Sequence, residues 1–337
     1  MSNVYELLLR HPTLFTANTT ILGSEARFPA GWVDLLKQEQ VHVATPDLQT
    51  AEAYQTSLSA DRVQFGVPDI AAMSGRKVIL LWPKAKAAGQ ALVSMLSHVT
   101  DNCYIVAAND AGGKSIGNAV KPFAESSTKI DSARHCSLWN VQLSKTDQAP
   151  NWLRFASSFK AGDLSFMTLP GVFGHGKLDR GTALLLEHVP APAHGKLLDL
   201  GCGSGVIGLT MKARCNALDV TLTDVDAMAL RSTELNSARL ALETSIAASN
   251  GLKSVEGRFD YIFSNPPFHQ GKRTDYEFAA RLFQDAKRHL NRGGQLWIVA
   301  NRHLAYEEWA TEAFQNAKVM VQAEGFKLIC ASDGALL

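Results

Sequence analysis

The sequence lacks a net charge, a long apolar run and any paired cysteine motif. Its net charge is only +1 over 337 residues, so nucleic-acid binding through bulk positive charge is not indicated. No apolar run approaches the ~20 residues that a membrane helix needs, and the amino terminus shows no signal peptide. The five cysteines are scattered, with no Cys-x-x-Cys pair. We therefore expect a cytoplasmic protein with no metal, no disulfide framework and no membrane partner.

What is present is an ordinary core composition, with 46% hydrophobic and 19% charged residues. The length suits roughly two domains. Short apolar runs alternate with helical segments along the chain, which predicts an α/β fold with parallel, doubly wound sheets. The most plausible boundary is the segment 148 to 151. We expect a first domain over residues 1–150 and a second over residues 151–337.

Segments of the first half correspond in the same order to segments of the second half, which predicts two tandem Rossmann-like domains. The segment Val41 to Asp47 corresponds to Val220 to Asp226, and Gly75 to Pro83 corresponds to Gly257 to Pro266. The first copy lacks the residues that could do chemistry, since Gly23 stands alone where the second copy has three glycines. We interpret the first domain as degenerate. The alternative is a chance likeness, because buried parallel strands resemble one another.

Residues 261 to 268 read Tyr-Ile-Phe-Ser-Asn-Pro-Pro-Phe, a strand that two prolines end. In open α/β sheets, ligands bind at the carboxyl ends of the strands. The Asn265 side chain and the Pro266 carbonyl can each accept an N–H of a planar amine, while Phe268 can stack on an unstacked base. This corner predicts methyl transfer to an amino group. The alternative is a structural Pro-Pro turn with a buried Phe.

A second motif, Asp199-Leu200-Gly201-Cys202-Gly203-Ser204-Gly205, lies between a predicted strand and helix. Gly201, Gly203 and Gly205 let the backbone approach a ligand. Asp224 ends the next strand and can bind ribose hydroxyls, so an adenosine cofactor is predicted. A dinucleotide also fits this segment. Asp199 favours S-adenosylmethionine, because its carboxylate would repel a pyrophosphate and attract the cofactor's positive charges.

These motifs resemble the class I methyltransferases that modify exocyclic amino groups. The stretches 169–173, 178–181, 257–260 and 265–269, with 82–84 and 129–134 in the first half, are similar to the ribosomal RNA small subunit methyltransferase C family. The resemblance covers nearly the full chain. It implies S-adenosylmethionine-dependent N2-methylation of guanosine in 16S ribosomal RNA. The chain departs from the family at Gly174-His175-Gly176, which leaves the contacts of that loop open.

Residue by residue, the resemblance implies that the guanine is held by Asn265, Pro266 and Phe268. The cofactor would be bound by Asp199, Gly201, Gly203, Gly205, Asp224 and Asn250, with Asp179 and Gly181 near its methionine end. Asn250 ends the third strand and could contact the adenine edge, or be a polar strand end only. His269 is a candidate proton acceptor or a surface contact.

The expected partner is ribosomal RNA or the small ribosomal subunit, bound by a monomer. RNA phosphates would contact local basic residues: Lys84, Lys86, Lys272 and Arg273. A solvated surface is the alternative for the first pair. Other functions stay open on the motifs alone: methylation of adenine N6 or a glutamine amide, a dinucleotide-dependent oxidoreductase, or a non-enzymatic RNA-binding scaffold.

Overall fold

The computed structural model describes residues 3–266 and 272–334. It divides into two compact units, which we describe separately. The first comprises Met1–Ala156 with Leu169–Gly171 and Asp226–Met228, and the second holds the rest of the chain. Among the described residues, no helix has both the length and the apolar composition of a membrane span.

The first unit is built on a seven-stranded sheet of order β3-β2-β1-β4-β5-β7-β6. β1 to β5 are parallel, whereas β7 runs antiparallel to both β5 and β6. Its strands are β1 (Thr19–Leu22), β2 (His42–Thr45), β3 (Val63–Phe65), β4 (Lys77–Leu81), β5 (Asn102–Ala108), β6 (Ala124–Ala133) and β7 (Cys136–Leu143). Its helices are α1 (Asn3–Leu8), α2 (Trp32–Gln38), α3 (Leu48–Gln55), α4 (Lys86–Leu96) and α5 (Ile116–Val120).

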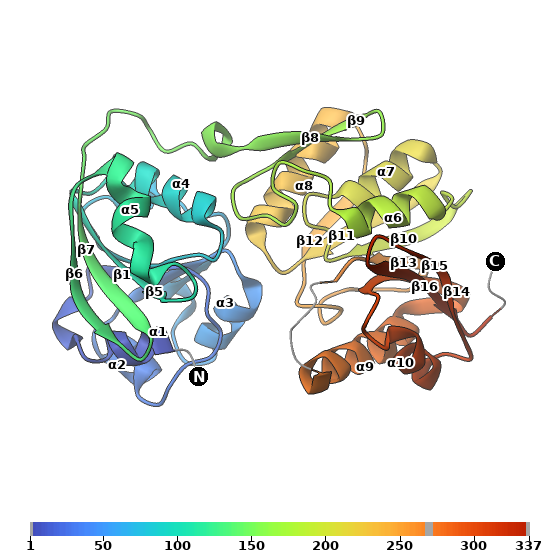
Figure 1. Ribbon diagram of the computed structural model, residues 1–337, viewed down its shortest axis with the longest axis horizontal. Helices are drawn as coiled ribbons and strands as arrows, with labels where there is room; N and C mark the ends of the chain where they lie inside the picture. The colour runs from blue at the N-terminus through green and yellow to red at the C-terminus, as the bar shows by residue number, and fades with distance from the viewer. Residues whose placement is uncertain (1–2, 267–271, 335–337) are drawn as a thin grey trace. The chain divides into compact units, whose positions relative to one another are not determined.

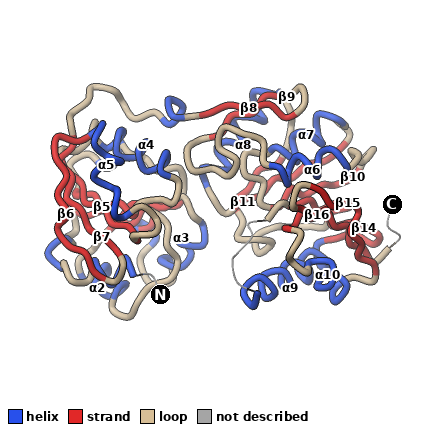
Figure 2. Tube along the Cα trace, in the orientation of Figure 1, coloured by secondary structure: helices blue, strands red, loops and turns tan. Residues whose placement is uncertain are grey.

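Both faces of this first sheet are buried, which explains its continuous apolar strands. Successive residues point to opposite faces. Ile21 and Ile79 pack with α1, α2 and α3 on one side, and Leu22 and Leu80 pack with α4 and α5 on the other. Figure 2 shows the strands of this unit between helical layers.

The second unit repeats the same order in a seven-stranded sheet, β12-β11-β10-β13-β14-β16-β15. The hairpin β8 (Ser157–Ala161) and β9 (Leu164–Thr168) precedes it. The sheet strands are β10 (Gly195–Leu200), β11 (Leu218–Asp224), β12 (Ser245–Ala248), β13 (Phe259–Ser264), β14 (Leu290–Asn301), β15 (Asn316–Ala323) and β16 (Phe326–Ser332). The helices are α6 (Arg180–His188), α7 (Val206–Arg214), α8 (Ala227–Leu240), α9 (Lys272–His289) and α10 (Tyr306–Ala313).

Helices cover both faces of this sheet as well. α6 and α7 pack on the face that carries Leu197 and Phe263, and α9 and α10 pack on the face that carries Leu198 and Ile262. Figure 1 shows these two pairs of helices on opposite sides of the strands. The carboxyl ends of β10 and β13 meet at the point where the strand order reverses, the usual ligand site of such sheets.

The prediction of two tandem Rossmann-like domains is confirmed, since the two sheets have the same strand order. β1, β2, β4 and β5 stand where β10, β11, β13 and β14 stand, as the sequence repeat predicted. The sequence reading missed five elements: α3, α5, β6, α10 and β15. β6 and β15 are edge strands with mostly exposed or half-exposed residues, so their sequences carry little apolar signal.

Candidate active site

The predicted corner lies beside the glycine loop of the second unit. β13 ends at Ser264, and Asn265 and Pro266 follow directly. Ser264 pairs with Leu200 of β10, and its hydroxyl donates a hydrogen bond to the Leu200 carbonyl over 2.7 Å. Gly201 follows Leu200, so the structure brings the corner and the loop together at the carboxyl edge of the sheet.

The Asn265 side chain is held in one orientation. Its Nδ2 donates to Asp179 Oδ2 over 2.8 Å and to Thr182 Oγ1 over 3.0 Å. A carboxylate can only accept, so the amide nitrogen must face Asp179. The carbonyl oxygen Oδ1 therefore forms the opposite, acceptor end of the side chain. This is the polarity that holding an amine requires.

Asp179 is itself fixed, because it caps α6. Its Oδ2 accepts a hydrogen bond from the Thr182 backbone N–H over 3.0 Å, which satisfies a donor of the first helical turn. A single carboxylate oxygen thus binds both the helix end and the Asn265 amide. The start of α6 determines the position of the corner's side chain.

Gly181 leaves the room for this arrangement. A Cβ at this position would lie 2.9 Å from Val299 Cγ1, 3.1 Å from Asp179 Oδ2 and 3.3 Å from Asn265 Nδ2. Such contacts are tighter than normal packing allows. Any larger residue would push against the Asp179–Asn265 hydrogen bond, so a side chain is excluded here by the site and not by backbone conformation.

The glycine loop has a left-handed backbone at each predicted glycine. The φ angles of Gly201, Gly203 and Gly205 are 72°, 58° and 79°. Space is open beside Gly201 and Gly203, where a Cβ would meet nothing within 4 Å. Gly205 instead packs against Leu209 of α7 and Thr233 of α8. The first two glycines therefore face room for a ligand, whereas the third is needed for packing.

Asp224 and Asn250 follow at the ends of the next two strands. The Asp224 carboxylate accepts a hydrogen bond from the Gly203 N–H over 2.8 Å, which ties the loop to the end of β11. The Ser249 N–H donates to the Asp224 carbonyl over 2.9 Å, and Asn250 comes next. Three predicted positions, Gly203, Asp224 and Asn250, are thus connected along one edge of the sheet.

Asp199 is fully buried beneath the loop. Its Oδ2 accepts a hydrogen bond from the Gly208 N–H over 2.8 Å, whereas its buried Oδ1 has no hydrogen-bond partner in the described chain. Burial raises the pKa of Asp199 to about 7, the Gly208 hydrogen bond lowers it, and the negative charge of Asp224 raises it. A buried, unpaired carboxylate oxygen favours a positively charged ligand.

Together these groups fit S-adenosylmethionine. The open space at Gly201 and Gly203 admits a ligand against the backbone, and the unpaired Asp199 oxygen suits a cation. A pyrophosphate would instead meet the charge of Asp199, which disfavours the dinucleotide alternative.

Two residues of the site were missed from the sequence. Thr182 binds Asn265, and its position three residues after Asp179 is a capping signal that could have indicated it. The other is Gly208, which completes a Gly-x-Gly-x-x-Gly pattern with Gly203 and Gly205. In the structure it allows α7 to approach Asp199, because a Cβ there would lie 2.8 Å from Leu222 and 3.1 Å from Asp199.

The departure at Gly174 to Gly176 is an anchored loop. The His175 ring contacts the Ser157 hydroxyl at 3.1 Å and the Thr168 hydroxyl at 3.0 Å. The Gly176 N–H also donates to the Thr168 hydroxyl, over 3.2 Å. These bonds attach the segment before Asp179 to the β8–β9 hairpin.

Several predicted residues are not tested by the structure. Phe268 and His269 lie outside the described residues. Lys272 and Arg273 belong to the first turn of α9, but their side chains also lie outside the described part. Lys84 and Lys86 are exposed between β4 and the start of α4. The assignment of these lysines to RNA stays a prediction.

Comparison with known proteins supplies a family for both halves. Residues 5–159 match the methyltransferase small domain N-terminal family, and residues 163–330 match the methyltransferase small domain family. The chain is 35% identical over 338 residues to ribosomal RNA small subunit methyltransferase C of Pseudomonas fluorescens, covering 98% of each chain. It is 40% identical over 263 residues to the protein of that name from Ectopseudomonas mendocina, covering 76% of this chain and 79% of the relative.

A solved structure has the same fold across nearly the whole chain. It is a 16S rRNA N2 methyltransferase of T. thermophilus in complex with AdoMet and guanosine, with a TM-score of 0.80 and 22% identity. The match covers 98% of this chain and 92% of that one.

Proposed function

The chain belongs to the ribosomal RNA small subunit methyltransferase C family, and we propose that it transfers a methyl group from S-adenosylmethionine to N2 of a guanosine in 16S ribosomal RNA. The observation that carries this proposal is the fixed Asn265 amide, which directly follows the strand end that is bonded to Leu200 before the glycine loop. Family membership separates guanine from the adenine and glutamine alternatives, which the corner itself also fits.

S-adenosylmethionine supplies a methyl group on a positively charged sulfur. The residues proposed to hold it are Asp199, Gly201, Gly203, Asp224 and Asn250, with Asp179 and Gly181 toward the corner. Asp179 binds the Asn265 side chain directly, so its role includes positioning the amine acceptor. A vestigial RNA-binding scaffold is disfavoured, because the second unit retains an open glycine loop and a buried unpaired carboxylate oxygen.

The work of the protein is to position the amine. The lone pair of guanine N2 is delocalised into the ring, so the amine must be held with that lone pair toward the methyl group. Asn265 Oδ1 and the Pro266 carbonyl would each accept one N–H, and Phe268 would stack on the base. A new N–C bond forms as the S–C bond breaks, and the amine proton leaves to solvent. Alignment of bound reactants can contribute ~7–11 kcal/mol to lowering the barrier.

The first unit would dock the RNA. Its loop for a cofactor is reduced to one glycine, while Lys84 and Lys86 are exposed at the carboxyl edge of its sheet. We place RNA phosphates there and at Lys272 and Arg273. We further propose that the chain acts as a monomer, and that it meets its ribosomal RNA substrate in the cytoplasm.

The proposal is tested by supplying the purified chain with S-adenosylmethionine and small-subunit RNA from cells that lack the protein. One arm uses naked RNA and the other assembled subunits. Mass spectrometry of the digested nucleosides should show new N2-methylguanosine in at least one arm. New N6-methyladenosine, or no new methylated nucleoside in either arm, would contradict the assignment.

A further inference from the structure

A cavity lies in the first unit, at the carboxyl edge of its sheet. Its volume is about 1050 Å³, slightly above the usual range of small-molecule sites. Leu22, Leu81 and Val106 line it from the ends of β1, β4 and β5, and Leu92 lines it from α4. β1 and β4 are the neighbours at which this strand order reverses. The cavity therefore lies at the position of the first sheet that corresponds to the proposed cofactor site of the second sheet.

This cavity cannot take the cofactor in the same way. Gly23, the counterpart of Gly201, has no room beside it, because a Cβ there would lie 2.6 Å from Leu81 Cβ. Thr45 stands where the second unit has Asp224. Its hydroxyl contacts the Ser24 hydroxyl at 3.1 Å and accepts from the Asp47 N–H at 3.2 Å. The loop space is filled and the ribose-binding acid is replaced.

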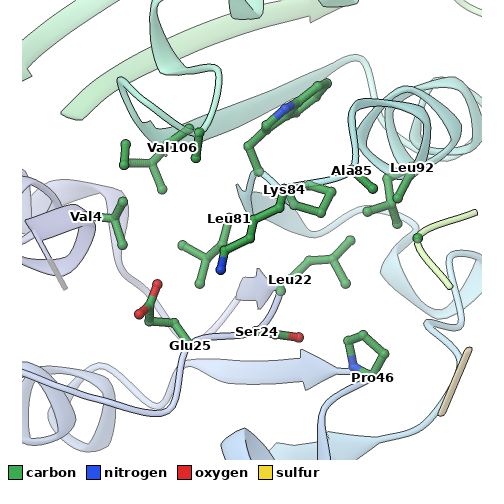
Figure 3. Close-up of a pocket in the computed structure, with 18 of the residues that line it drawn as sticks. Val4, Leu22, Ser24, Glu25, Pro46, Leu81, Lys84, Ala85, Leu92 and Val106 are labelled. Carbon is green, nitrogen blue, oxygen red and sulfur yellow. The ribbon is translucent and has the colours of Figure 1, made fainter. Parts of the chain in front are cut away.

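Charged side chains of both signs line the cavity: Lys84 and Lys114 are basic, and Glu25, Asp110 and Asp226 are acidic. Figure 3 shows the Lys84 side chain extending into the pocket, with its amino group directed toward the side on which Glu25 lies. No ion pair joins Lys84 to Glu25 in the part of the chain that the structure describes, so each can serve a ligand. The backbone of Glu25 is fixed, because its carbonyl accepts a hydrogen bond from the Tyr5 hydroxyl over 2.9 Å.

We propose that this cavity binds an unstacked guanine of the ribosomal RNA, distinct from the guanine that is methylated. Guanine presents two adjacent donors, N1–H and N2–H, which match the Glu25 carboxylate. It presents two acceptors, O6 and N7, on its other side, which match the Lys84 ammonium. The leucine and valine side chains offer an apolar surface for the ring. This inference rests on the proposed function, because it names a second contact of the same substrate.

The neighbouring hairpin turn contributes His135 to the cavity lining. Arg134 and His135, between β6 and β7, have φ angles of 55° and 58°, a conformation that costs free energy in residues other than glycine. His135 lines the cavity, and its carbonyl accepts the Asn109 N–H over 2.7 Å. A two-residue hairpin turn can require positive φ at both of its residues, so this conformation belongs to the turn that holds His135 at the cavity.

The test uses the full chain with Asn265→Ala, which removes the proposed guanine contact of the catalytic corner. Calorimetric titration with the four nucleoside 5′-monophosphates should show preferred binding of guanosine monophosphate, by about tenfold or more as for a paired base contact. Adding Glu25→Gln or Lys84→Ala should abolish that preference. The same Glu→Gln change at Glu39, on the C-terminal end of α2 and outside the cavity lining, should leave it intact.

A second readout uses the chain with Asn265 intact. Glu25→Gln should raise KM for ribosomal RNA and leave kcat unchanged, since the cavity binds substrate without touching the reacting amine. Equal binding of all four nucleotides, or an unchanged KM in the Glu25→Gln variant, would overturn the inference. Failure of the proposed function gives a different result, namely no methyl transfer by the unaltered chain.

Discussion

Asn265 Nδ2 donates a hydrogen bond to Asp179 Oδ2 over 2.8 Å, across 86 positions of sequence. The bond fixes which end of the amide faces the substrate side. Since Asp179 also caps α6, the orientation of one side chain depends on where a helix begins. The predictions below test this dependence and the cofactor site beside it.

Asn265→Ala should reduce kcat for methyl transfer by about 10²-fold or more, by analogy with loss of one preorganised polar contact to a reacting group. Affinity for S-adenosylmethionine should be unchanged, because Asn265 does not belong to the glycine loop. Single-turnover methylation and calorimetric titration measure the two effects separately. Equal loss of both would show that the corner is structural.

Thr182→Val should lower kcat about five- to tenfold, which corresponds to a net hydrogen bond of ~1 kcal/mol. It removes one of the two acceptors that hold the Asn265 amide and keeps the backbone N–H that Asp179 caps. Thr210→Val is the matched control, since that buried hydroxyl has no hydrogen-bond partner in the described chain. The control should retain the full rate and at least the original melting temperature.

The sequence predicted those parts of the site that are contiguous in the chain. The glycine loop and the Asn265 corner each stand on one short segment, and strand order then brings them together. The contact of Asn265 with Thr182 joins segments far apart in sequence, so no local pattern specifies it. The unpaired oxygen of Asp199 likewise depends on what packs over the residue.

The buried elements of the fold were predictable from the sequence, whereas the exposed and short ones were not. Buried parallel strands such as β4 and β13 are continuous apolar runs, and their repeat revealed the duplication. β6 and β15 pair at the sheet edges with partly exposed residues, so composition alone does not distinguish them from loops. α5 spans only five residues, too few for a helical period to show.

Gly181→Ala should destabilise the chain and slow methylation. On helix propensity alone, alanine would be favoured by ~1 kcal/mol. Here the added Cβ would lie 2.9 Å from Val299 and 3.1 Å from Asp179 Oδ2, so either the helix start or the Asp179–Asn265 bond must shift. Thermal unfolding and kcat measure the two consequences. A variant with a higher melting temperature and an unchanged rate would refute this account.

Asp199 should make the stability of the cofactor-free chain depend on pH. Burial raises its folded pKa to about 7, whereas an unfolded aspartate titrates near ~3.9. Between these values the folded state binds more protons, so Asp199 makes stability fall as pH rises from about 4 to 7 and level off above. Asp199→Asn should remove this contribution. The melting temperature of the variant minus that of the unaltered chain should therefore be larger at pH 8 than at pH 4.

The same carboxyl should couple cofactor affinity to pH. A positively charged ligand favours the ionised form, so affinity for S-adenosylmethionine should rise toward pH 7, by at most about tenfold per pH unit. Calorimetry in two buffers of different ionisation enthalpy should detect proton release on binding. Asp199→Asn should bind more weakly and lose the proton release. Equal proton release by the variant would assign the effect to another group.

Replacing both Lys84 and Lys86 with alanine should weaken ribosomal RNA binding and flatten its salt dependence. Each phosphate contact to single-stranded RNA contributes about −0.7 to the slope of log affinity against log salt, so loss of two contacts should change the slope by up to about 1.4. Lys145→Ala is the control. Lys145 forms an ion pair with Asp101 over 3.1 Å, and Asp101 directly precedes β5 at the amino edge of the same sheet. If Lys84 contacts a base instead of a phosphate, the slope should change by about half as much, and Lys86→Ala alone should account for it. A double variant with an unchanged slope would remove RNA phosphates from this edge of the first unit.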